Sequence, residues 1–334
     1  MGTQTRGGWP AAIDGASERV PLVVTDGRSG SRLERVRLAD GRVVVVKRVA
    51  PAWDWIVRAT EDSGRIVELA ASGLLDRVPA VLDHTVIGAE RDGDGWLVVM
   101  RDATPLLVDD GAHIDRAAGR RVLDAAAALH EAFWATPAAE RVPLCTLTAR
   151  YAYLSPATAA REAGGPDVVP ELIGRGWELF ADLVPAEVAD PVFAVLDRPQ
   201  VLADAMAGFP ATLIHGDLKL GNLGFGPDRV VALDWGTQTG WAPPAIELAW
   251  YQAINASRID ATREQVLDDF RAGQGERHDE DALRLALFGG LVQLGWDKAL
   301  QAAGHADGAV RAREAADLDW WVARAREALA VWSP

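Results

Sequence analysis

The chain has 334 residues, of which 49% are hydrophobic and 25% are charged, a composition that excludes a disordered or fibrous protein. Its 48 Asp and Glu residues outnumber its 34 Lys and Arg residues, and the net charge of −14 argues against a broad nucleic-acid surface. At roughly 150 residues per domain, the length predicts two domains or lobes.

The N-terminal segment and the cysteine content favour a cytoplasmic location of the protein. Residues 1–18 are rich in small and polar types and contain no apolar run, so we predict a loose leader rather than a secretory signal. The single cysteine, Cys145, excludes an intrachain disulfide and favours a reducing, cytoplasmic location. No stretch approaches about 18 consecutive apolar residues, so we expect no membrane-spanning helix and no membrane partner.

A β-rich unit is predicted next in the chain. Short runs rich in β-branched residues, bounded by turn signals, predict strands at 20–25, 32–38, 43–49, 80–87 and 96–100. Asp40-Gly41 marks a hairpin turn, and apolar residues at helical spacing predict a helix over 63–75. We therefore place an N-terminal lobe at 19–103.

From about residue 114 the sequence becomes mostly helical. An Ala-rich segment predicts a long buried helix at 114–134, and helices are expected later at 245–255, 263–272, 280–302 and 309–331. One β-like segment at 212–233 interrupts them. Because strands precede helices rather than alternate with them, the expected fold class is α+β with a second lobe at 104–334.

The most informative segment runs from 213 to 235 and reads LIHGDLKLGNLGFGPDRVVALDW. His215, Asp217 and Asn222 form the pattern H-x-D-x-x-x-x-N, and two apolar runs joined by a turn follow, ending at Asp234. A hairpin would return the chain to its start and bring Asn222 and Asp234 together beside Asp217. Carboxylate and amide oxygens suit Mg²⁺, which takes the rest of its shell from water and phosphates. The alternative is that Asp217 and Asp234 only cap turns.

This segment resembles the catalytic loop and metal-binding aspartate of the protein-kinase-like superfamily. The H-G-D form followed by D-W is similar to the aminoglycoside phosphotransferase and choline kinase branch. The resemblance implies a bilobal kinase-like fold in which Asp217 orients the acceptor hydroxyl and accepts its proton. It also implies that Asn222 and Asp234 hold Mg²⁺ and that Lys219 reaches the transferred phosphoryl group. His215 is expected to brace the backbone.

The same resemblance implies nucleotide contacts in the first lobe. Lys47, in VVVVKRV, lies where the superfamily places a lysine on the α- and β-phosphates; the alternative is that Arg48 points inward instead. Glu68 is chosen as the carboxylate that pairs with Lys47, with Glu61 as the alternative. The loop 26–31, including Ser29, departs from the G-x-G-x-x-G pattern but still offers backbone N–H groups to phosphate.

The connector WLVVMRDA is expected to bind the purine through backbone groups. We place Met100 at the back of this pocket and Arg101 and Ala103 along it. Since backbone groups make the contacts, the sequence does not choose between ATP and GTP.

Further along the chain, eight residues separate Asp234 from Pro243, which is too short for a peptide-docking loop and argues against a protein kinase. Glu247 is a candidate brace for the catalytic loop or a solvent-facing helix residue. The 13 tryptophans are expected mainly in the core; those considered for ligand surfaces are Trp53, Trp55, Trp235, Trp241 and Trp250.

The expected function is therefore transfer of a phosphoryl group from ATP or GTP, with Mg²⁺, to a hydroxyl of an aminoglycoside-like antibiotic, amino alcohol or sugar. The alternative is a kinase-like nucleotide-binding regulator without transfer activity. Acidic residues in the last third of the chain either attract a cationic acceptor or form solvated faces: Asp260, Asp268, Asp269, Glu276, Asp279, Glu280 and Asp297.

Overall fold

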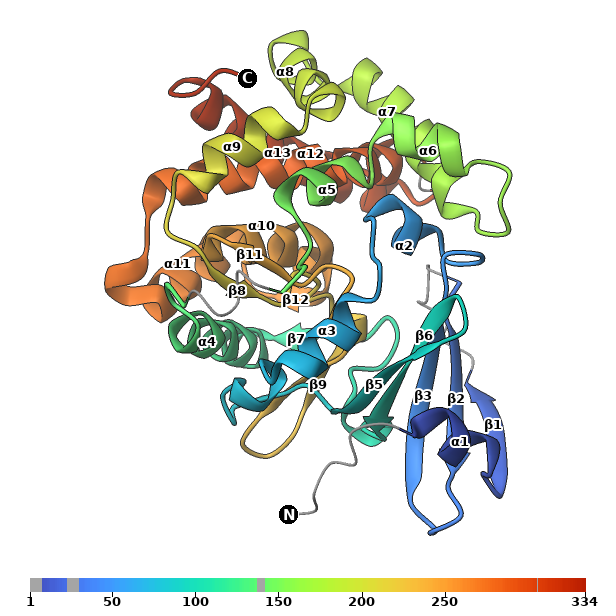
Figure 1. The fold of residues 1–334 in the computed structure, drawn as a ribbon. Helices are drawn as coiled ribbons and strands as arrows, with labels where there is room; N and C mark the ends of the chain where they lie inside the picture. Colours follow the sequence, from blue (N-terminus) through green and yellow to red (C-terminus); the bar gives the residue numbers. More distant parts are fainter. Residues whose placement is uncertain (1–7, 23–29, 137–141, 305) are drawn as a thin grey trace.

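The computed structural model describes residues 8–22, 30–136, 142–304 and 306–334, and the chain folds into two lobes (Figure 1). The small lobe holds an antiparallel sheet and the large lobe is mostly helical, so the α+β prediction is confirmed. The sheet has the order β1-β2-β3-β6-β5, with the bounds β1 Glu18–Leu22, β2 Arg32–Arg37, β3 Val43–Val49, β5 Val86–Asp92 and β6 Gly95–Arg101.

Strand β3 is buried on both faces. Val46 packs with Ile13 of helix α1 (Trp9–Asp14) in a small core, whereas Val45 packs in the main core of the molecule. Because successive side chains of a strand point to opposite faces, Lys47 shares the face of Val45 and faces the large lobe. Burial on both faces is also why the valine run shows no period-2 pattern.

Helix α1 corrects the expectation of a loose leader through residue 18. Trp9 and Ile13 are 7% and 0% exposed and cover the face of the sheet that is turned away from the large lobe. A Cβ atom added to Gly88 would lie 2.0 Å from the indole nitrogen of Trp9, so the ring rests directly on β5. Six residues, five of them apolar or small, are thus enough for a helix once a sheet is present to pack against.

Two helices connect β3 to the rest of the small lobe. Helix α3 (Arg65–Ser72) lies within the predicted span 63–75 and ends at Gly73, whose φ of 73° is left-handed. Helix α2 (Trp55–Ala59) is not predicted from the sequence. It begins at Asp54, whose side chain accepts a hydrogen bond from the backbone of the third residue of the helix.

The large lobe packs around helix α12, which contacts α13, α7 and α10. Its sixteen buried residues give α12 no polar face, as expected of a helix surrounded by others. The helices are α4 Arg116–Ala132, α5 Leu147–Ala152, α6 Pro156–Glu162, α7 Val169–Leu183, α8 Ala186–Asp197, α9 Gln200–Ala207, α10 Pro244–Asn255, α11 Arg263–Gln274, α12 Glu280–Gly304 and α13 Gly308–Leu329.

Short strands of the large lobe carry the predicted catalytic segment. Strands β9 (Leu223–Phe225) and β10 (Val230–Ala232) form an antiparallel hairpin, and β10 also pairs with β4 (Leu82–Asp83) of the small lobe. Just before and after the hairpin, β8 (Thr212–Ile214) pairs with β11 (Gly240–Ala242). One further parallel pair joins β7 (Ile114–Asp115) to β12 (Ile259–Asp260). Of these pairings, that of β10 with β4 joins the two lobes.

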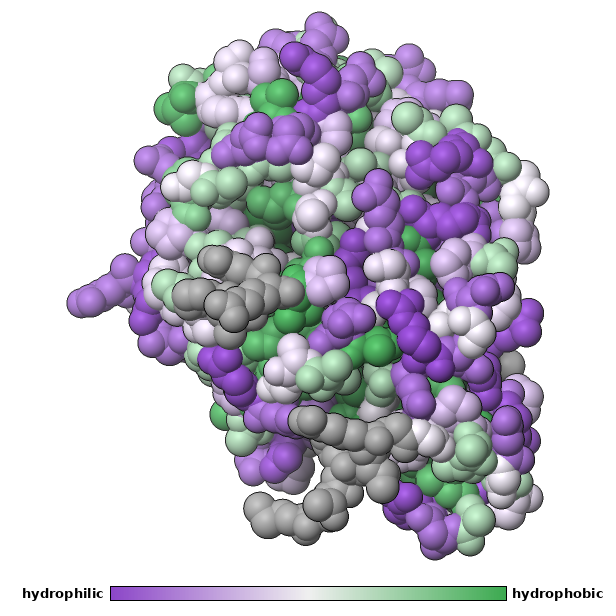
Figure 2. Space-filling view, viewed as in Figure 1, coloured by the Kyte–Doolittle hydropathy of each residue, from purple (hydrophilic) through white to green (hydrophobic). Residues whose placement is uncertain are grey.

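Polar and charged side chains cover most of the face shown in Figure 2, and apolar residues are exposed between them near its middle. Within the described ranges, no helix combines the length and apolarity that a bilayer crossing requires.

Candidate active site

The hairpin brings the predicted polar residues to one end. The register pairs Ala232 with Leu223, and the amide of Leu233 donates to the carbonyl of Asn222 (2.8 Å). Asn222, just before β9, and Asp234, just after β10, therefore lie at the same end of the hairpin. The Nδ2 of Asn222 donates to the Oδ2 of Asp217 (2.9 Å) and to its carbonyl oxygen (3.0 Å). The structure therefore places Asp217, Asn222 and Asp234 together.

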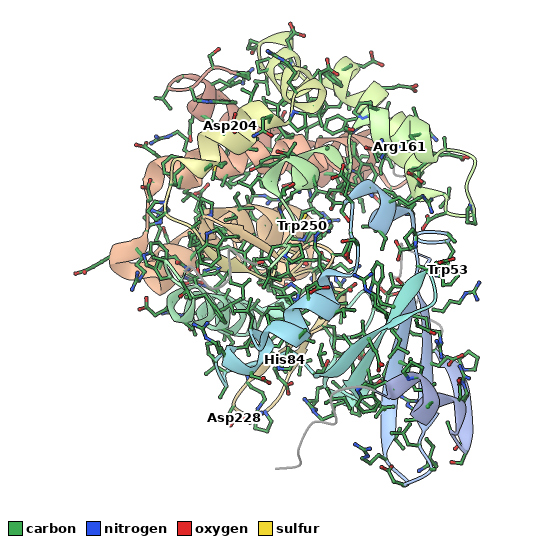
Figure 3. The ribbon with its side chains drawn as sticks, viewed as in Figure 1. Trp53, His84, Arg161, Asp204, Asp228 and Trp250 are labelled. Carbon is green, nitrogen blue, oxygen red and sulfur yellow. The ribbon has the colours of Figure 1, made fainter. Side chains whose placement is uncertain are left out.

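Asp217 is held by two donors. Besides Asn222, the indole Nε1 of Trp250 donates to its Oδ1 (2.9 Å). Figure 3 shows Trp250, from α10, in the interior of the molecule, whereas Asp228 lies at the outer tip of the hairpin turn. The sequence predicts Trp250 in the core or on a ligand surface and does not predict this hydrogen bond, because nothing local links a tryptophan to a carboxylate 33 residues away.

Lys47 lies against Asp234, with its Nζ 2.5 Å from Oδ1 of Asp234. Burial alone would lower the pKa of Lys47, but Asp234, with smaller contributions from Asp54 and Asp217, raises that pKa above its usual value. Burial likewise opposes ionisation of Asp234, yet Lys47, assisted by Lys219, lowers the pKa of this carboxyl. Both groups are therefore charged at neutral pH, and the alternative with Arg48 inward is wrong, since Arg48 pairs with Asp92.

Glu68 is not the partner of Lys47. Its side chain is 46% exposed and lies 3.8 Å from Arg91, on the solvent side of α3. The alternative Glu61 is exposed and does not line the cavity described below. The helix that carries Glu68 packs its Ile66 and Leu69 inward, which turns the glutamate out.

Asp54 supplies a further carboxylate near Lys47 that the sequence analysis missed. It is 2% exposed, lines the same cavity, and accepts hydrogen bonds from the Ser31 hydroxyl (2.8 Å) and the Val57 amide (3.1 Å). Burial raises the pKa of Asp54 despite these donors. The available signal was an aspartate directly before an apolar helical segment, which is a typical helix cap.

The loop before Asp217 is braced from beneath by Glu247 of α10. Its carboxylate accepts the amides of His215 (2.8 Å) and Gly216 (2.7 Å) and lies 3.4 Å from Nε2 of His130. His215 itself donates from Nε2 to the carbonyl of Leu233 (2.9 Å) and accepts the Asp217 amide at Nδ1 (3.1 Å). The bracing roles expected for His215 and Glu247 both agree with this geometry.

Glu247 is ionised in this setting. Burial would raise its pKa, but the hydrogen bond from His130, the imidazoles of His130 and His215 and the amide of Gly216 outweigh burial and lower the pKa. A second buried residue, Arg150, donates to the carbonyl of Gly216 (2.8 Å) from the other side. The loop is thus fixed by a carboxylate below and a guanidinium beside it.

A cavity of about 680 Å³ lies between the lobes, and these residues line it. From the small lobe come Lys47, Asp54, Met100, Arg101 and Ala103; from the large lobe come Asp217, Lys219, Asn222 and Asp234. Met100 is buried at 6% exposure, whereas the side chain of Arg101 is half exposed and pairs with Asp83.

The loop before β2 also reaches the cavity. Gly30 and Ser31 line it, and a Cβ on Gly30, whose φ is 80°, would lie 2.3 Å from the carbonyl of Trp53. This close approach requires glycine. Ser29, the residue chosen from this loop, lies outside the described residues.

The donor set fits a hard divalent cation shared with phosphate. Asp234 offers carboxylate oxygen and Asn222 an amide oxygen, the ligand types that Mg²⁺ prefers. Within the described part of the chain, no group of three or more His, Cys, Asp or Glu side chains is arranged to hold a metal alone. Such a site suits an ion whose remaining ligands come from a bound nucleotide and water.

Comparison with known proteins gives a consistent result. The model of the phosphotransferase enzyme family matches residues 23–287. No curated protein matches the chain significantly.

Many solved structures share the fold. An aminoglycoside phosphotransferase from Streptomyces rimosus is 19% identical with a TM-score of 0.50, covering 85% of this chain and 96% of that one. A choline kinase from Streptococcus pneumoniae is 13% identical with a TM-score of 0.51, covering 92% and 94%. A spectinomycin phosphotransferase in complex with ADP and spectinomycin is 11% identical with a TM-score of 0.52, covering 94% and 93%.

Proposed function

Because the chain belongs to the phosphotransferase enzyme family, we propose that it transfers the γ-phosphoryl group of ATP or GTP to a hydroxyl group of a small molecule. The observation that carries the proposal is the meeting of Asp217, Asn222, Asp234 and Lys47 in one cavity between the lobes. Phosphoryl transfer needs a clamp for phosphate charge and a positioned acceptor, and this set contains groups for both.

In this proposal the small lobe, residues 19–103, binds the nucleotide. The backbone near Met100, Arg101 and Ala103 contacts the purine, and Lys47 binds the phosphates, while the loop before β2, with Ser29 among its residues, approaches them through backbone N–H groups. Mg²⁺, held by Asn222 and Asp234, neutralises charge on the phosphates when it is bound. Asp234, with a smaller contribution from Asp54, keeps Lys47 charged, and Glu68 takes no part in this.

Asp217 then orients the acceptor hydroxyl and accepts its proton. Its hydrogen bonds from Asn222 and Trp250 fix the carboxylate while leaving it on the cavity wall. Lys219 stands on the same wall, and its positive charge contributes to the lowered pKa of Asp234. In this proposal Lys219 also reaches the transferred phosphoryl group. The lobe 104–334 is thus the catalytic and acceptor-binding part. A cytoplasmic location, where such nucleotides are abundant, completes the proposal.

A kinase-like regulator that binds nucleotide without transfer is the second candidate. The observation against it is the hydrogen-bonded placement of Asp217, since a protein that only binds nucleotide has no need of an acceptor-orienting carboxylate.

The proposal is tested with a panel of hydroxylated amines, sugars and antibiotics incubated with Mg·ATP or Mg·GTP. We expect at least one compound to gain the mass of one phosphoryl group, and Asp217→Asn to reduce that rate about 10²–10⁴-fold while nucleotide binding survives. Asp228→Asn, at the exposed hairpin tip, is the matched control and should leave the rate unchanged.

Turnover by Asp217→Asn close to that of the unaltered protein would remove the role assigned to this residue. Thermal stabilisation by nucleotide without transfer to any compound would favour the regulator.

A further inference from the structure

Resting on the proposed function, we infer that the acceptor is a largely apolar hydroxylated molecule with one positive charge, and not a polycation. The inference concerns the part of the cavity beyond Asp217, which we call the acceptor region. It is lined by Tyr153, Leu154, Leu172, Leu294, Trp296 and Leu300, next to Trp250.

The acceptor region adjoins Asp217 through Trp250 and Tyr153. Trp250 donates its hydrogen bond to Asp217, and the ring of Tyr153 lies 6.3 Å from that of Trp250. Helices α7 and α12 form the next wall and are tightly packed, because a Cβ on Gly176 would lie 2.4 Å from the carbonyl of Trp296. Figure 1 shows these helices at the opposite end of the molecule from the small-lobe sheet.

Carboxylates are scarce in this region although the chain is strongly acidic. Among the residues that the structure describes, four carboxylates line the whole cavity; Asp54, Asp217 and Asp234 belong to the catalytic and nucleotide-binding part, which leaves Asp297. A ligand with several cationic groups would have to place most of its charges beside apolar side chains without a carboxylate partner, which is unfavourable. One cation can be accommodated, but several cannot.

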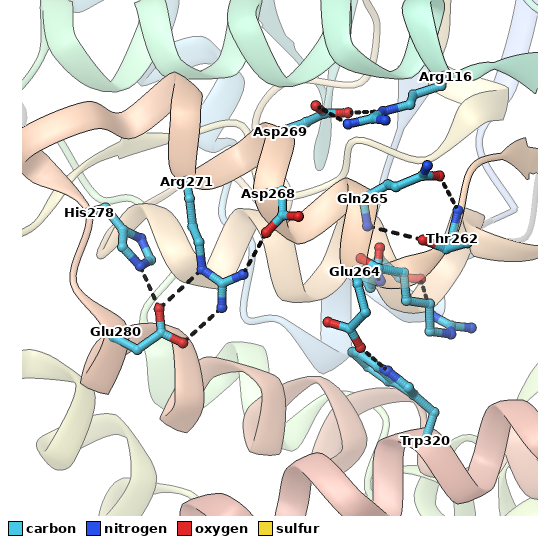
Figure 4. A network of polar contacts seen from close by, with 12 residues as sticks. Arg116, Thr262, Glu264, Gln265, Asp268, Asp269, Arg271, His278, Glu280 and Trp320 are labelled. Carbon is cyan, nitrogen blue, oxygen red and sulfur yellow. Dashed lines mark hydrogen bonds and ion pairs between the residues drawn. The ribbon is translucent and has the colours of Figure 1, made fainter.

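The other acidic residues considered from the sequence do not line the cavity. Figure 4 shows Asp269 bound to Arg116, and Asp268 and Glu280 bound to Arg271. Asp260 lies 3.4 Å from His113. These four carboxylates have basic partners within the protein and lie outside the cavity, so they do not contribute negative charge to the acceptor region.

Asp297 is suited to bind the single cation. It is partly buried on α12, accepts a weak hydrogen bond from Gln301 (3.4 Å), and forms no ion pair with any residue in the described ranges. Trp296 and Tyr153 line the same region, and aromatic rings attract a cation placed against their faces. An amine between Asp297 and these rings would be both paired and desolvated.

The test measures binding by calorimetry and therefore does not depend on turnover. The probes are a macrolide with one dimethylamino sugar, its neutral aglycone, dimethylaminododecanol and streptomycin, which carries several cationic groups. We expect both monoamines to bind at least about tenfold more tightly than streptomycin. Tighter binding of streptomycin than of both monoamines, or no binding of either monoamine, overturns the inference.

Three variants on α12 examine the charge. Asp297→Asn should weaken the macrolide about tenfold and leave its aglycone unchanged, whereas Asp297→Glu should keep most of the affinity. Asp281→Asn, at the exposed start of the same helix, is the matched control and should change neither. Equal effects of Asp297→Asn on the amine and the neutral aglycone, with an unchanged melting temperature, would contradict the assigned cation site.

The outcomes separate this inference from the proposed function. Tight binding of a monoamine without phosphoryl transfer would refute the proposed activity while upholding the chemistry of the region. Phosphorylation of streptomycin without binding of either monoamine would uphold the proposed activity and refute the chemistry inferred for the acceptor region.

Discussion

Lys47 stays charged between the lobes because carboxylates surround it. Asp234 contacts its ammonium group directly, and Asp54 and Asp217 contribute from further away. The raised pKa of Lys47 means that its contribution to stability is present below the pKa of the unfolded chain and is lost as pH rises through the folded value. Because the pKa of Asp234 is lowered, the contribution of this carboxylate to stability is present above the pKa of the unfolded chain and is lost as pH falls through the folded value. The pair is therefore intact across neutral pH.

Asp234→Asn tests the same pair at the nucleotide site. The amide keeps the size of the side chain but removes the charge that Lys47 and Mg²⁺ both need. We expect the affinity for Mg·ATP, measured by calorimetry, to fall by more than about 100-fold, because loss of a direct ligand should exceed the effect of losing its supporting partners. Asp228→Asn serves as the control, and an unchanged dissociation constant for Asp234→Asn would exclude a role in binding the metal–nucleotide complex.

At the level of elements, the catalytic loop depends on helix α10. Glu247 on this helix accepts two consecutive amides of the loop, and Trp250, one turn later, donates to Asp217. A single helix thus fixes both the backbone of the catalytic loop and the position of the Asp217 carboxylate. Any displacement of α10 should therefore change catalysis before it changes nucleotide binding.

Glu247→Gln should lower the free energy of unfolding by about 1–3 kcal/mol at neutral pH, because an amide cannot accept two backbone donors equally well. Since the folded pKa of Glu247 is lowered, its contribution is complete above the unfolded pKa and disappears as pH falls through the folded value. The difference between variant and parent should therefore shrink in acid, as measured by urea unfolding at several pH values. A difference that grows in acid would contradict the assigned ionisation.

Gly216→Ala tests the loop backbone itself. Gly216 has a φ of 86°, and a Cβ there would lie 2.0 Å from the carbonyl of Gln238. We expect a loss of stability greater than the roughly 1–2 kcal/mol that a left-handed conformation alone costs, together with loss of transfer activity. Gly111→Ala is the matched control, since Gly111 has a φ of 73° with nothing within 4 Å. If thermal unfolding shows the same loss of stability for both variants, the contact between the added Cβ and the carbonyl of Gln238 does not destabilise the loop.

On the scale of the whole molecule, the small-lobe sheet is covered on both faces. Helix α1 protects one face, and the cavity and large lobe protect the other. Ile13→Ala should lower the free energy of unfolding by about 2–5 kcal/mol, because the side chain is fully buried and leaves a void. Denaturant unfolding measures this. Ala12→Ser, on the exposed side of the same helix, should change little, and a negligible effect of Ile13→Ala would show that α1 is dispensable.

The sequence by itself determined the parts of the site that depend on short-range geometry. The spacing of Asp217, Asn222 and Asp234 around one tight hairpin brings them together whatever surrounds the hairpin, and the strands around Lys47 follow from local β-branched runs. Where neighbours are close in sequence, periodicity and turn chemistry are sufficient.

Only the tertiary structure decided which distant groups meet. Lys47 and Asp234 are 187 residues apart, so their pairing, the exposure of Glu68 and the presence of Asp54 follow from how the lobes pack. Helix α1 and the apolar acceptor region also depend on tertiary contacts. The few apolar residues of α1 form a helix because they pack against the sheet, and the acceptor region is built from several separate segments of the chain. Burial and long-range electrostatics are properties of the assembled core, and a local pattern does not contain them.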